Sequence, residues 1–210
     1  MPHLKVIPIN RADQTRRRLT QAMGTVLARV GFEAATVDLV IAEAGLKRGD
    51  FYRYFARLSQ LVAAYAHSGA FWPNAGDLIG RDREKLRRMS PDQLVAAFFK
   101  RTLRLLLDRP ESLAIMAWEA LSRNDLSRAL EGVRERSALE FFELMEQDPP
   151  VDVDLTALVL FLAGGVNFLA VRSLVTGCVG GVDLVSPAGW ARIEETIDLI
   201  VRRTLAHGPS

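Results

Sequence analysis

The sequence has a single cysteine, Cys178, and only three histidines, at positions 3, 67 and 207. One cysteine excludes an intramolecular disulfide and fits a reducing compartment. These few, scattered residues do not form the Cys and His set of a structural zinc site, so we predict no bound metal. The first 18 residues lack an apolar run, so we expect no secretory signal and a cytoplasmic protein.

Motifs for catalysis and cofactor binding are also missing. The chain has no G-x-S-x-G, no Walker loop, no H-E-x-x-H and no paired cysteines. The glycine-rich stretch 177–181 follows a predicted helix instead of a strand, which argues against phosphate binding. We therefore predict that the protein is not an enzyme and carries no cofactor.

Strand signals are nearly absent, because no run of residues alternates between apolar and polar in the way a half-buried strand does. Apolar residues recur instead every three or four positions, as in Leu19, Met23, Val26, Leu27 and Val30. Ser90-Pro91 and Ser186-Pro187 are typical helix starts. The sequence predicts an all-α fold of about nine helices.

The formal net charge of +2 conceals an uneven distribution. Residues 1–58 carry ten Lys and Arg against five Asp and Glu, a formal charge of +5. Residues 59–210 carry 17 basic and 20 acidic side chains, a formal charge of −3. A small basic unit on a mildly acidic body is a common arrangement when a DNA-binding module is joined to a second domain.

The segment from Thr36 to Tyr54 has the layout of a helix-turn-helix. Thr36 is a suitable N-cap for a first short helix, and Gly45 can adopt the left-handed backbone of a tight turn. A second short helix of basic and polar residues follows the turn. Such a helix can enter the major groove of DNA, so this pattern favours a DNA-binding head.

Three strings carry a more specific signal: Val30-Gly31-Phe32-Glu33-Ala34-Ala35, Ala44-Gly45-Leu46 and Gly49-Asp50-Phe51-Tyr52-Arg53-Tyr54-Phe55. Over about residues 11–66, they resemble the TetR family of bacterial transcriptional regulators. The resemblance implies a three-helix DNA-binding head, residues 1–58, and an effector-binding and dimerisation body, residues 59–210. The residues that match the family's DNA contacts are Thr36, Lys47, Arg48, Gly49, Asp50, Tyr52, Arg53 and Arg57.

Four positions depart from the family's pattern. Ile41 replaces the usual small residue where the second and third helices cross, so this crossing is bulkier. Lys47 replaces a Ser or Thr, which removes a side-chain cap worth about 1 kcal/mol. Asp50 replaces a Thr-like residue, and could accept from a cytosine amine or pair with a neighbouring arginine. Leu58 replaces the usual lysine near the start of the fourth helix, so Arg57 would have to contact the phosphate instead. These departures leave the operator sequence open.

The stretch Leu155–Val171 has 17 residues without a charge. Its length is at the lower edge for a membrane span, and its central glycines and flanking charges argue against one. We expect instead a helix of a homodimer interface, paired with the last helix of the chain. The residues expected at this interface are Phe161, Leu162, Gly165, Trp190, Ile197 and Val201.

The body also contains many apolar residues with few polar neighbours, which suits a small, largely hydrophobic effector. The expected effector-binding residues are His67, Phe98, Phe99, Trp118, Asn167 and Phe168, although aromatic residues at helical spacing are equally consistent with an ordinary core. The resemblance thus implies a homodimeric repressor that releases a near-palindromic double-stranded DNA operator when an effector binds. The alternatives are a constitutive helical DNA-binding protein without an effector, or a helical small-molecule carrier or enzyme.

Overall fold

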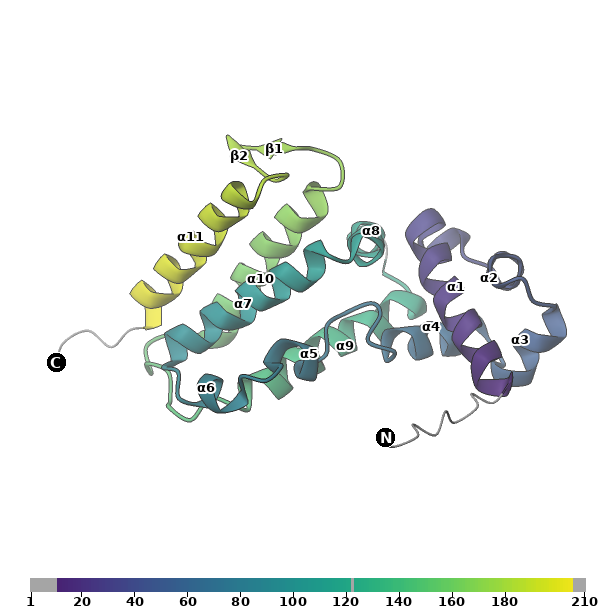
Figure 1. Cartoon of the computed structure of the whole chain (residues 1–210), viewed down its shortest axis with the longest axis horizontal. Coiled ribbons are helices and arrows are strands. Elements are labelled where there is room, and N and C mark those ends of the chain that lie inside the picture. Colours follow the sequence, from purple (N-terminus) through teal and green to yellow (C-terminus); the bar gives the residue numbers. More distant parts are fainter. Residues whose placement is uncertain (1–10, 122, 206–210) are drawn as a thin grey trace, which may run out of the picture.

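A computed structural model describes residues 11–121 and 123–205, which form eleven helices and one short hairpin (Figure 1). The head comprises α1 (Arg11–Ala34), α2 (Val37–Ala44) and α3 (Arg48–Tyr54). Its core is built from buried apolar side chains of α1 together with Val40 and Phe51, and Val30 of α1 packs half-buried against it. In Figure 1 the head lies at one end of the molecule, with α3 on its outer side.

The body begins with α4 (Leu58–Ala66), two short helices, α5 (Ala75–Ile79) and α6 (Arg83–Arg87), and the long α7 (Pro91–Leu107). It continues with α8 (Pro110–Glu119), α9 (Asp125–Phe142) and α10 (Leu155–Arg172). The strands β1 (Cys178–Val179) and β2 (Val182–Asp183) precede the last helix, α11 (Pro187–Leu205). Helix α7 packs against both α10 and α11 at the end of the molecule opposite the head (Figure 1).

The all-α fold class is confirmed, but the expected count of about nine helices is too low for the described residues. The difference is the two short helices α5 and α6, which lie between α4 and α7. Asn74 caps α5 locally, because its side-chain oxygen accepts from the backbone N–H of Asp77 at 2.9 Å. The stretch 177–181 is part of an antiparallel hairpin, with Gly180 and Gly181 at positive φ in its turn.

Head and body are joined mainly through α1, α4 and α8. The Tyr65 hydroxyl of α4 donates to the Glu111 carboxylate of α8 at 3.0 Å, and Thr25 of α1 donates to the same carboxylate at 3.3 Å. At the other end of α8, the Trp118 indole N–H donates to the Ala28 carbonyl oxygen at 3.1 Å. Helix α8 therefore holds α1 at two points, so a movement of α8 would move the head.

Candidate functional site

The outer face of α3 is polar and exposed, as a surface that reads DNA must be. Among the residues expected to contact DNA, Lys47, Arg48, Gly49, Tyr52 and Arg53 are exposed. Phe51 points inward and is fully buried, which fixes the orientation of the helix on the head. Tyr52 remains 51% exposed, which is high for an aromatic residue, and its ring packs edge-to-face on Phe51 at 5.2 Å.

The turn before α3 has the geometry that the sequence predicted. Thr36 caps α2 by accepting from the Leu39 backbone N–H at 3.3 Å, and Gly45 has the left-handed φ of 59°. The Arg18 guanidinium of α1 donates to the carbonyl oxygens of Ala44 at 2.5 Å and of Gly45 at 3.3 Å. This contact, which sequence reasoning missed, ties the C-terminus of α2 to α1, because a cation is favourable at that end of a helix.

Two of the departures from the family pattern have a structural explanation. The Asp50 carboxylate accepts from the backbone N–H of Lys47 at 3.1 Å, so it caps α3 in place of the missing Ser or Thr. Arg48 lies 3.7 Å from Asp38 in an exposed ion pair and does not bond to Asp50. Leu58 is half-buried against the head and body core, whereas Arg57 before it is exposed. Among the residues that the structure describes, Arg57 is therefore the exposed cation at the start of α4.

Gly49 lies in the first turn of α3 and has no packing reason to be a glycine. A methyl group added there would meet no atom of the chain within 4 Å. Its backbone also lies outside the left-handed region that favours glycine. The packing and backbone of the described residues thus give no reason for a glycine at this position.

A cavity of about 410 Å³ lies between α7, α9 and α10 in the body. Three of the expected effector-binding residues, Phe98, Phe99 and Asn167, line it. Trp72, Thr102 and Arg134 also line this cavity, and sequence reasoning missed all three. Trp72 and Thr102 are buried, and their indole nitrogen and hydroxyl have no hydrogen-bond partner among the described residues. Buried polar atoms of this kind need a partner, but both atoms are themselves shielded from the cavity, so a ligand or water there would reach them only after the wall rearranges.

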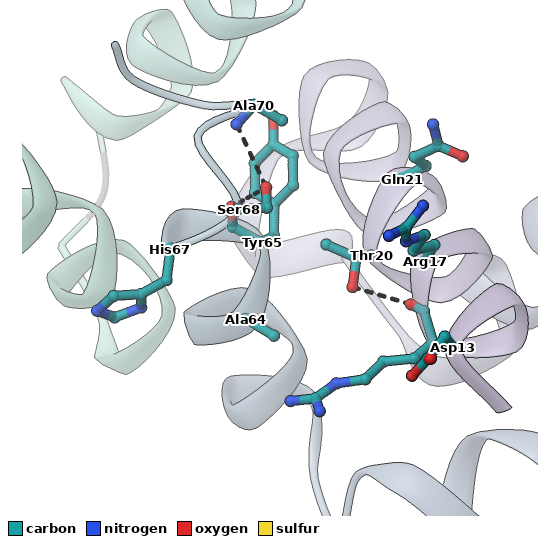
Figure 2. Close-up of a pocket in the computed structure, with 10 residues that line it drawn as sticks. Asp13, Arg17, Thr20, Gln21, Ala64, Tyr65, His67, Ser68 and Ala70 are labelled. Atoms are coloured by element: carbon teal, nitrogen blue, oxygen red, sulfur yellow. Dashed lines mark hydrogen bonds between the residues drawn. The ribbon is translucent and has the colours of Figure 1, made fainter. Parts of the chain in front are cut away.

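The other three expected effector-binding residues lie elsewhere. His67 is exposed at the C-terminal end of α4, with its Nδ1 2.7 Å from the Ala63 carbonyl oxygen, and Phe168 is largely exposed on α10. Trp118 packs against Gly31, where α1 bends, so its role is to join head and body. A larger, polar hollow of about 730 Å³ lies between α1 and α4 (Figure 2), and His67 is at its edge.

The expected dimer residues divide into three groups by exposure. Leu162, Ile197 and Val201 are buried within the subunit, so their side chains belong to its own core. Trp190 is half-buried and donates to the Leu184 carbonyl oxygen at 3.0 Å. Phe161, 76% exposed, and Gly165 lie on the open face of α10, which carries the further exposed apolar side chains of Leu160 and Phe168.

By length and composition, α10 is also the one described helix that could cross a membrane. It packs with Leu162, Val166 and Ala170 against the rest of the body, and Asp154 caps its start by accepting from the Ala157 backbone N–H at 2.9 Å. Among residues 11–121 and 123–205, no three His, Cys, Asp or Glu side chains are grouped in a way that could hold a metal ion.

A capped helix-turn-helix with an exposed basic helix, carried on a larger helical body, defines a helix-turn-helix DNA-binding protein. Residues 22–65 match the model of the bacterial regulatory proteins of the tetR family. Residues 22–65 therefore form a helix-turn-helix domain of the tetR family type.

Comparison of the whole chain with solved structures shows the same fold. A TetR family transcription regulator from Marinobacter aquaeolei is 18% identical, with a TM-score of 0.61 over 94% of this chain and 98% of that one. The transcriptional regulator FadR from Bacillus subtilis, solved in complex with stearoyl-CoA, is 13% identical, with a TM-score of 0.60 over 88% of this chain and 96% of that one. The multidrug binding protein EbrR, solved with imidazole, is 16% identical, with a TM-score of 0.56 over 93% and 97%. Among curated proteins, none matches this chain in sequence.

Proposed function

We propose that this protein is a one-component cytoplasmic repressor that binds a near-palindromic operator as a homodimer and releases it when a small, largely hydrophobic effector binds. The observation that carries the proposal is the exposed face of α3, where cations, Tyr52 and a sterically unexplained Gly49 lie together. Each feature suits contact with a DNA duplex: cations for phosphates, a phenol for hydrogen bonding, and glycine for close backbone approach.

The homodimer is supported by the exposed apolar face of α10. Leu160, Phe161 and Phe168 leave large side chains in solvent, although the opposite side of the same helix packs against the body. Soluble monomers rarely expose a contiguous apolar patch of this kind. Pairing two such faces about a two-fold axis would cover both. To bind two half-sites one turn of DNA apart, the homodimer needs its two α3 helices about 34–36 Å apart.

The release of DNA by an effector is supported by contacts between the cavity wall and α8. Arg134, which lines the cavity, forms a bidentate ion pair with Glu119 of α8, at 2.7 and 2.8 Å. Glu119 follows Trp118, whose indole holds α1, and Glu111 at the other end of α8 holds both Thr25 and Tyr65. A ligand that displaces α9 against α8 would thus change the angle of the head and the distance between the two α3 helices. A coupling of about 1–3 kcal/mol is typical for such a change.

Operator binding is tested by selecting duplexes from a random pool with the full-length protein and measuring their affinity by fluorescence anisotropy. We expect Arg48→Ala and Tyr52→Phe each to weaken binding at least tenfold, about 1.4 kcal/mol, with an unchanged melting temperature. The exposed Arg48–Asp38 pair contributes at most about 1 kcal/mol to stability. Arg128→Ala, which removes an exposed, ion-paired arginine of α9, is the matched control and should leave DNA affinity unchanged.

Three results would contradict parts of this proposal. Failure to select any preferred duplex would favour a carrier or an enzyme. Selection of a duplex that no small molecule releases would favour a constitutive DNA-binding protein. Equal weakening by Arg128→Ala and Arg48→Ala would place the DNA surface outside α3.

A further inference from the structure

We propose that the cavity between α7, α9 and α10 takes a lipophilic cation: an apolar, aromatic molecule that carries one positive charge and a hydrogen-bond acceptor. This inference deepens the proposed function, because it names the chemical class of the effector. It rests on the lining of the cavity alone, so it can be tested without DNA.

Aromatic rings dominate one side of the cavity. Phe98, Phe99 and Trp72 line it, and Phe98 and Phe99 pack edge-to-face with ring centroids 5.2 Å apart. Opposite them lie the small and apolar residues Val159, Ala163 and Gly164 of α10. The volume of about 410 Å³ falls within the usual range of small-molecule sites. Aromatic faces attract cations, and the Arg134 guanidinium already lies 5.8 Å from the Trp72 ring centroid.

The charges of the lining leave one carboxylate without a partner. Arg134 is paired with Glu119, and Glu131 lies 3.3 Å from Arg123. Glu135 lines the cavity, is exposed, and forms no ion pair among the described residues. The charged lining residues, Glu131, Arg134 and Glu135, therefore sum to a formal charge of −1, and the negative charge is available at Glu135.

The charges of the cavity lining are unfavourable for an anionic ligand. The only cation in the lining is Arg134, and both of its terminal nitrogens are bonded to Glu119. The Glu119 side chain is only 12% exposed, so drawing Arg134 away would leave a buried carboxylate without its partner, which is strongly destabilising. The cavity thus selects against carboxylates and phosphates by charge, although its apolar surface would suit an acyl chain.

The two unpartnered polar groups indicate an acceptor on the ligand. The Trp72 indole N–H can only donate, and the Thr102 hydroxyl can donate or accept. Trp72, which precedes α5, and Thr102, which lies in α7, both line the cavity. After a small rearrangement of these two side chains, a carbonyl or ether oxygen between them could accept from both. The cationic group would then lie toward Glu135 on α9.

Two dyes with a shared xanthene core test this inference. Rhodamine 123 is a cation with an ester carbonyl, and fluorescein is its anionic oxygen analogue. Their binding to the DNA-free, full-length protein is measured by fluorescence polarisation. We expect rhodamine 123 to bind at least tenfold more tightly than fluorescein. Glu135→Gln should reduce the affinity for rhodamine 123 several-fold, and Glu143→Gln should not, because Glu143 is an exposed residue at the end of α9 outside the cavity lining.

The acceptor is tested with Thr102→Val, which keeps the shape of the wall and removes the hydroxyl. It should reduce the affinity for rhodamine 123 without lowering the melting temperature, since the hydroxyl has no hydrogen-bond partner to lose among the described residues. Fluorescein binding as tightly as rhodamine 123, or an unchanged affinity in Glu135→Gln, would overturn the inference.

The failure of this inference can be told apart from the failure of the proposed function. A protein that selects an operator but binds no rhodamine 123 would refute the ligand class and leave the repressor. A protein that binds rhodamine 123 as expected, but keeps its operator when the dye is present, would support the ligand class and refute release of DNA.

Discussion

The substitution Gly49→Ala separates a role in DNA binding from a role in folding. Gly49 lies in the first turn of α3, and an added methyl group would meet no atom of the chain within 4 Å. Alanine is favoured over glycine in a helix by about 0.5–1 kcal/mol, so the free energy of unfolding should rise slightly. For a chain of this length, that increase corresponds to a gain of about 1–4 °C in melting temperature.

The same methyl group should weaken operator binding. If the backbone of Gly49 lies against the sugar-phosphate chain, the methyl group forces the two apart and lengthens the neighbouring phosphate contacts. We expect at least a tenfold loss of affinity, about 1.4 kcal/mol, measured by anisotropy on the selected duplex. Gly132→Ala is the matched control: Gly132 lies in α9, and an added methyl group there also meets nothing within 4 Å. It should stabilise the protein and leave DNA affinity unchanged.

Two results would refute this reasoning about Gly49. Wild-type affinity in Gly49→Ala would show that the first turn of α3 does not approach the DNA backbone. A lower melting temperature in Gly49→Ala, with a higher one in Gly132→Ala, would show that α3 needs a glycine for reasons inside the chain.

Further predictions concern the dimer and the contact between head and body. Phe161→Glu should convert the dimer to a monomer in light scattering. The control is Leu139→Glu, which changes a comparably exposed apolar residue on α9 and should leave the protein dimeric. A Phe161→Glu variant that is still dimeric would place the interface elsewhere. Burial and the adjacent Glu111 carboxylate raise the pKa of the Tyr65 phenol well above its usual value of 10.0. The stability linked to this proton is therefore present below about pH 10 and is lost as the pH rises above it, because the unfolded chain then releases a proton that the folded chain retains. Tyr65→Phe should show a shallower loss of stability above about pH 10 in denaturant titrations, and parallel curves for the two proteins would contradict this account.

Much of the head was predictable because its determinants are local. Thr36 caps α2 by accepting from the backbone N–H of Leu39, only three residues further along the chain, and Gly45 makes the turn through its backbone angle alone. The role of Asp50 was not predicted, although its signal was present: an acidic residue three positions after an N-cap is typical of a capped helix start. The two short helices α5 and α6 were missed because each is only five residues long and has no apolar period of its own.

The sequence by itself determined the helical class, the helix-turn-helix and its family, because caps, turns and apolar spacing act within a few residues of each other. The tertiary structure alone decided which apolar residues are core and which are exposed: Leu162 and Phe161 are neighbours on α10, yet one is buried and the other is 76% exposed. It also brought Trp72, Thr102 and Arg134 to one cavity, and joined Arg134 to Glu119. These residues come from separate helices and loops up to 62 positions apart, and only the packing of those elements brings their side chains together.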